Sequence, residues 1–124
     1  MLNPVDVVNG GKPKFGTTHE LILVGMGIRG FEQVDGTFFL ATEPPGGKGR
    51  PHLFSWDGKS NRPRRVFVTL PKNANPESVL IFPDTGLNEI HILSDDGSQE
   101  IGGDPCNELD NADQRRFRRL ILSR

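Results

Sequence analysis

The chain has 124 residues, of which 34% are hydrophobic, with 15 glycines, 10 prolines and a formal net charge of −1 at pH 7. This length is enough for one domain with a real core, and the turn-rich composition favours an all-β fold over a helical bundle. The near-zero net charge excludes a global field that would attract nucleic acid or anionic membrane, so neither is an expected main partner.

The first 18 residues contain glycines and prolines with little periodicity. They predict an N-terminal arm with at most one short strand, at Val5–Val8. They also lack the basic start and apolar stretch of a signal peptide, and no apolar run approaches the ~18 residues of a membrane span. We therefore expect the chain as given to be cytoplasmic, and to be exported only if it is a fragment of a longer precursor.

The domain itself is expected over residues 19–124, and its first predicted strand is His19–Val24. Two hairpins follow, with turns at Asp35-Gly36 and Asp57-Gly58, and an Asp-Gly pair between β-rich runs is a strong hairpin signal. These hairpins predict a four-stranded antiparallel meander composed of Gly30–Val34, Thr37–Thr42, Pro51–Trp56 and Arg65–Leu70.

A second unit is predicted to begin with strands at Glu77–Phe82 and Glu89–Ser94. A polar loop is expected at Gly102–Asp113, in which the single cysteine, Cys106, is a half-buried thiol without a disulfide partner. Arg115–Leu122 fits either a strand or a short helix. The strand is favoured because the internal repeat described next requires one.

An imperfect internal repeat relates the two units. Arg29-Gly30-Phe31 matches Glu77-Ser78-Val79 at an offset of 48 residues, and the strands that follow match at an offset of 52. Propeller blades repeat at ~40 to 50 residues. The predicted fold is therefore all-β, with antiparallel meanders forming two propeller-type blades of about eight strands, if the leading strand completes the second blade.

Two blades do not close a propeller, which needs ~4 to 8. The favoured hypothesis is completion by oligomerisation, with a trimer that supplies six blades. The alternatives are that the chain is a piece of a longer propeller, or that its strands close into a small barrel or sandwich.

Several short motifs follow one another from about Gly25 to the end of the chain: Gly27-Ile28-Arg29-Gly30, Leu53-Phe54-Ser55-Trp56-Asp57-Gly58, Pro76-Glu77, Leu93-Ser94-Asp95-Asp96-Gly97, Cys106 and Arg116-Phe117-Arg118. In this order they resemble the C-terminal part of a bacterial family of uncharacterised β-propeller proteins, related in pattern to the esterase-like phytase and gluconolactonase-like propellers. Two features differ: Ser78 follows Glu77 where the family has Pro-Glu-Gly, and family members have more blades. The resemblance implies a propeller fold in which a glutamate at the position of Glu77 can bind a divalent cation.

The candidate site is at the start of the innermost strand of each unit, where Arg29 and Glu77 occupy equivalent positions. Carboxylate oxygens suit Ca²⁺, and the candidate metal ligands are Glu77, Asp95, Asp96 and Glu43. In a metal-dependent hydrolase of the phytase or lactonase type, the candidate catalytic residues are Glu77, Arg29 and Glu32.

A simpler interpretation needs no metal and is favoured. Arg29 and Glu77 then form an ion pair between neighbouring strands, and Asp95-Asp96-Gly97 is a turn chosen for its backbone geometry.

Charge is segregated along the chain. Residues 48–72 hold seven basic residues and one acid, residues 73–114 hold ten acids and no lysine or arginine, and five arginines follow. The basic stretch and the arginine tail interleave with Phe54, Trp56 and Phe117, a mixture that could bind single-stranded nucleic acid weakly. Charged outer sheet edges are the favoured explanation. The function predicted from these observations is a self-associating binding or scaffold module, with the hydrolase and the nucleic-acid binder as alternatives.

Overall fold

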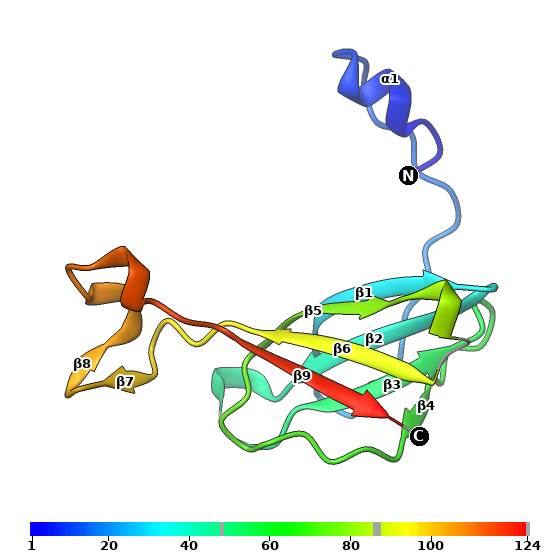
Figure 1. Ribbon diagram of the computed structural model, residues 1–124. Coiled ribbons are helices and arrows are strands. Elements are labelled where there is room, and N and C mark those ends of the chain that lie inside the picture. The colour runs from blue at the N-terminus through cyan, green and yellow to red at the C-terminus, as the bar shows by residue number, and fades with distance from the viewer. Residues whose placement is uncertain (48, 86–87, 124) are drawn as a thin grey trace.

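The computed structural model describes residues 1–47, 49–85 and 88–123, and strands dominate it (Figure 1). The first sheet has the order β1-β2-β3-β4 and consists of β1 (Gly27–Val34), β2 (Thr37–Glu43), β3 (His52–Trp56) and β4 (Arg64–Val66). The second has the order β5-β6-β9 and consists of β5 (Pro76–Ile81), β6 (Glu89–Ser94) and β9 (Arg118–Ser123). All paired strands are antiparallel.

A two-stranded hairpin of β7 (Glu100–Ile101) and β8 (Asp104–Pro105) stands away from both sheets (Figure 1). The helical elements are short: the α-helix α1 (Pro4–Val8) and the 3₁₀ turns Pro45–Gly47, Pro83–Thr85, Cys106–Glu108 and Ala112–Gln114. The predicted all-β class with antiparallel meanders is confirmed.

The hairpin with its turn at Asp35-Gly36 is confirmed, and so is the strand at the end of the chain. The second predicted hairpin is present as β3 and β4, but residues 57–63 connect these strands instead of a two-residue turn at Asp57-Gly58. The turn residues Asp35 and Gly36 both have positive φ angles, 49° and 76°, as expected for the tight turns whose twist matches that of the flanking strands. The predicted strand Arg65–Leu70 is shorter than expected, because pairing with β3 ends at Val66.

Three other expectations were wrong. Val5–Val8 is helical, because Pro4 suits the first helical position and Gly10, at φ 86°, follows the end of the helix. The predicted polar loop contains β8 and two 3₁₀ turns, and its Cys106 is buried. His19–Val24 belongs to no sheet of the described residues. Its Leu21 and Leu23 instead pack on the first sheet.

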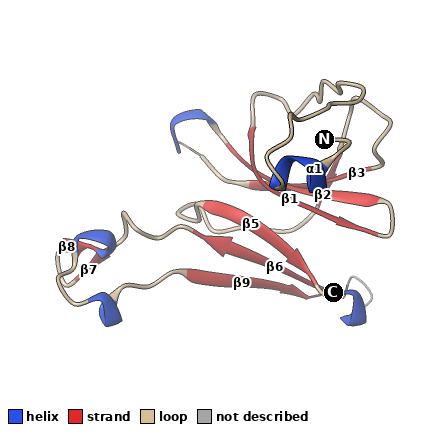
Figure 2. Cartoon of the chain, turned by 90° about the horizontal axis from the view of Figure 1, so that it is seen from above, coloured by secondary structure: helices blue, strands red, loops and turns tan. Residues whose placement is uncertain are grey.

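The two sheets lie face to face as two layers (Figure 2), and the main core fills the space between them. The first sheet contributes Phe39, Ala41 and Leu53 to this core, and the second contributes Val79, Ile81, Ile90 and Ile92. Alternate residues of each strand point to the other face. On the outer face of the first sheet, Leu40, Phe54 and Trp56 form a second cluster, which Leu21 and Leu23 cover.

Candidate functional site

Each sheet begins with a strand that carries a bulge at the same place in the repeat. In β1 the register shifts between Ile28 and Gly30, which leaves Arg29 as the extra residue. In β5 it shifts between Pro76 and Ser78, which leaves Glu77 as the extra residue. A bulge re-aims the side chain that it frees. The offset of 48 residues found in the sequence therefore relates two equivalent bulges.

The bulged strands approach each other closely, since β1 and β5 lie side by side (Figure 1). A Cβ atom added to Gly30 would lie 2.9 Å from Ser78 Cα and 3.0 Å from Val79 N. Contacts this short are not compatible with a side chain, so the approach requires glycine at position 30. The close approach holds the two bulges next to each other.

Arg29 bridges two carboxylates at this point. Its Nη2 forms an ion pair with Glu77 Oε1, and its Nε lies 3.3 Å from Glu43 Oε2. Glu43 is the more buried of the two acids. Its Oε2 is closed to solvent and makes no hydrogen bond to the described residues. Among these residues, the attraction of the Arg29 guanidinium is therefore what offsets the cost of burying this oxygen. The ion pair between Arg29 and Glu77, which was the favoured interpretation of the sequence, is present.

A polar cavity of about 280 Å³ lies beside this bridge. Arg29 and Glu43 line one part of it, and the loop that follows β4 contributes Lys72, Asn73 and Asn75. Ser98 and Gln99 complete the polar lining. The sequence did not predict that Lys72, Asn75 and Gln99 belong to this site, because these loop residues form no motif with the bulges and only the fold brings them together.

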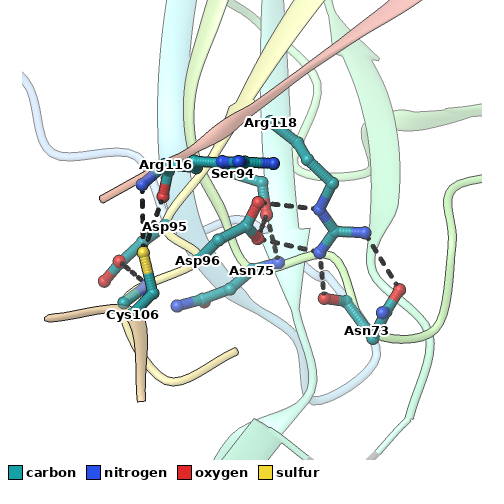
Figure 3. A network of polar contacts seen from close by, with 9 residues as sticks. Asn73, Asn75, Ser94, Asp95, Asp96, Cys106, Arg116 and Arg118 are labelled. Atoms are coloured by element: carbon teal, nitrogen blue, oxygen red, sulfur yellow. Dashed lines mark hydrogen bonds and ion pairs between the residues drawn. The ribbon is translucent and has the colours of Figure 1, made fainter. Parts of the chain in front are cut away.

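Asp96 belongs to a separate polar network, drawn in Figure 3. Arg118 on β9 donates from Nε to Asp96 Oδ2 at 2.7 Å and from Nη2 to Asp96 Oδ1 at 2.8 Å. The same guanidinium donates to the backbone oxygen of Asn73 at 2.7 Å, and Ser94 Oγ donates to Asp96 Oδ1 at 2.8 Å. The network ties β9 and β6 to the loop before β5.

These contacts change the ionisation of the pair. The hydrogen bonds from Arg118 lower the pKa of Asp96 below its usual value, and the hydroxyl of Ser94 adds to the effect, while burial opposes both. The carboxylate in turn raises the pKa of Arg118. Asp96 is therefore held as a carboxylate by a bidentate arginine.

The other candidates have structural partners as well. Asp95 Oδ1 accepts a hydrogen bond from Gly97 N at 2.9 Å, as expected for a turn. Glu32 Oε1 accepts one from Gln33 N at 2.9 Å, and Glu32 does not line the cavity. Across the described residues, no three His, Cys, Asp or Glu side chains are placed to hold a metal ion together. The structure thus unites Arg29, Glu43 and Glu77, and gives Asp95 and Asp96 other contacts.

Two of the three aromatic side chains considered for stacking on nucleic acid bases are buried. Phe54 and Trp56 are in the outer cluster of the first sheet, whereas Phe117 is exposed. The first residue of the basic stretch, Lys48, lies outside the described residues.

Comparisons with known proteins add no relative. No protein-family model matches the chain, and neither a curated protein nor a solved structure matches it significantly. Among the described residues, no helix is both long and apolar enough to cross a membrane.

Proposed function

We propose that the chain is a self-associating binding module whose two sheets act as neighbouring propeller-type blades. The observation that carries the proposal is the matched pair of bulges on β1 and β5, with Gly30 packed against Ser78. Successive blades of a propeller place equivalent first strands next to each other around one axis. A pair of sheets that repeats its own irregularity in this way supports a blade-to-blade relationship.

The packing between the sheets supports the same arrangement. The sheets are closest at β1 and β5, where backbones almost touch. Farther from this edge, an apolar cavity of about 230 Å³ opens between them, lined by residues that include Val66 of β4 and Leu122 of β9. Sheets that meet at their first strands and separate towards their last have the wedge shape that blades need to close a ring.

Each sheet also exposes apolar side chains on its outer face, where a further blade could pack. On the second sheet, Leu80 and Ile121 lie on either side of the buried His91 across three strands of the outer face, and Ile121 is 45% exposed. On the first sheet, the exposed ring of Phe31 stacks on Phe38. Three copies joined through such faces would give six blades, and would bring three Arg29–Glu43–Glu77 clusters and their polar cavities around one axis.

Light scattering over a range of concentrations tests this proposal. We expect a mass of three times the 13.7 kDa chain. Ile121→Glu places a charge on the outer face of the second sheet and should shift the protein towards monomer, because burying an unpaired carboxylate is costly. Val8→Glu introduces the same charge at an apolar position on α1 that is 86% exposed; it is the control and should remain trimeric. A monomeric wild-type protein at every concentration would refute the proposal.

A further inference from the structure

We propose that residues 19–23 of one copy form the fourth strand of the second sheet of a neighbouring copy, along the open edge of β9. This inference rests on the proposed self-association and states how the copies join. It explains two features together. The second sheet has three strands where the first has four, and the strand-like segment before β1 pairs with no strand among the described residues.

The second sheet ends at β9. This strand pairs with β6 over its whole length, from Arg118 opposite Ser94 to Ser123 opposite Glu89. Among the described residues, no strand pairs with its other edge, whereas in the first sheet β4 occupies the corresponding position. Figure 1 shows β9 in red along the border of the sheet.

This edge carries few of the features by which proteins discourage strand pairing. β9 contains no proline, and the charge of Arg118 is used in the bond to Asp96. Arg119 remains as an outward-pointing charge. A six-residue edge of this kind can accept another chain.

Residues 19–23 have the alternation of a strand. Leu21 and Leu23 pack on the outer cluster of the first sheet, whereas Ile22 between them is 48% exposed. Val24, at φ 53°, is in the turn that leads to β1. The backbone bonds of this segment to described residues run from Ile22 N to Asn61 O, at 2.8 Å, and from Met26 N to Leu23 O, at 3.1 Å. Most of its backbone groups are therefore available to a partner strand.

The segment already lies where a strand of an adjoining blade would be. It covers the outer face of its own first sheet. The second sheet of the same copy packs on the other face, across the main core. Its own β9 belongs to that second sheet, so a β9 edge that meets the segment in this position belongs to another copy. Leu21 and Leu23 can keep their contacts with Phe54 and Trp56 while the backbone pairs with the neighbour.

The side chains of the two strands match in this arrangement. In antiparallel pairing, opposite residues point to the same face. Leu21 and Leu23 then continue the face of Ile121, and Ile22 continues the face of Leu120 and Leu122, which pack against the core. Ile22 therefore meets leucines of β9 on one face, and Leu21 and Leu23 lie beside Ile121 on the other.

Hydrogen exchange on the wild-type protein tests the strand directly. We expect the amides of residues 19–23 to exchange on the order of 100-fold more slowly in the oligomer than in the monomer obtained by dilution, with amides of β9 gaining protection in the same transition. A second experiment mixes chains carrying Ile22→Cys with chains carrying either Leu120→Cys or Leu122→Cys. Oxidation should give a cross-linked dimer with one of these partners, whereas chains with Ile22→Cys mixed with wild type should not cross-link.

Ile22→Lys separates this inference from the proposed function. Position 22 is exposed in the monomer and tolerates lysine there, but the assembly would bury the lysine charge beside Leu120 and Leu122. The Ile22→Lys variant should therefore be monomeric, whereas the control Val8→Lys should still assemble. If the wild type stays monomeric, both proposals fail. A different result overturns the strand inference alone. In that case the oligomer forms, but residues 19–23 exchange as fast as in the monomer, no cross-link appears, and Ile22→Lys assembles normally.

Discussion

Removing the guanidinium of Arg118 should destabilise the protein because it leaves a buried carboxylate without its main partner. Asp96 is 5% exposed, and Arg118 supplies two of its hydrogen bonds, at 2.7 and 2.8 Å. The variant Arg118→Met keeps most of the side-chain volume and removes the charge. The Ser94 hydroxyl would be the remaining hydrogen-bond donor to Asp96 among the described side chains.

The expected loss follows from the burial of the pair. Breaking a fully buried ion pair costs about 3–5 kcal/mol. The side chain of Arg118 is 35% exposed, so water can replace part of the interaction, and the expected loss is smaller, at about 2 kcal/mol. Arg119→Met, at the exposed neighbouring position of β9, is the matched control and should change the free energy of unfolding by less than about 0.5 kcal/mol.

The effect should depend on pH. The pKa of Asp96 is lower in the folded protein than in the unfolded chain, so its contribution to stability is present above the unfolded pKa of about 3.9 and is lost as the pH falls through the folded pKa. Urea unfolding followed by the fluorescence of Trp56 at pH 7 and at acidic pH measures both effects. Equal losses in Arg118→Met and Arg119→Met, or a difference from wild type that does not shrink in acid, would refute the reasoning.

The remaining predictions concern the bulges and the two alternative functions. Gly30→Ala should destabilise the protein by about 1–3 kcal/mol, because the added Cβ would meet Ser78 at 2.9 Å. Gly27→Ala in the same strand, where the nearest atom is 3.9 Å away, should have little effect. Equal losses of stability in the two variants would contradict the close approach of β1 and β5. Calcium should not raise the melting temperature relative to EDTA, because Arg29 already pairs with Glu43 and Glu77; a rise of several degrees would favour the metal-dependent hydrolase. A fluorescent single-stranded oligonucleotide should not bind at low salt, since Phe54 and Trp56 are buried; salt-sensitive binding would favour the nucleic-acid alternative.

Local signals predicted the hairpins well. Asp35-Gly36 links β1 to β2 as expected, because the positive φ angles of a two-residue turn are needed wherever the hairpin lies in the fold. The repeat also predicted β9 at a position where the local sequence fits a helix equally well. The equivalent bulges show that the repeated residues encode an irregularity of the strand as well as its hydrophobic pattern.

The candidate site was only partly predictable. The pairing of Arg29 with Glu77 followed from their equivalent places in the repeat, because equivalent strands were expected to be neighbours. The bond between Asp96 and Arg118 was not predicted, since the residues are 22 positions apart and belong to no shared motif. The cavity residues Lys72 and Gln99 come from loops, whose placement depends on the packing of both sheets.

The sequence by itself determined the two antiparallel units, their turns and the strand-like alternation of residues 19–24. These properties depend on neighbours along the chain, namely turn geometry and the two-residue period of a strand. The tertiary structure decided that the units face each other across one core, that Arg29 bridges Glu43 and Glu77, and that residues 19–24 cover the first sheet without joining it. A strand's alternation specifies which side chains it buries, but its hydrogen-bonding partner is chosen by whichever sheet edge lies within reach, and that depends on the packing of the whole chain.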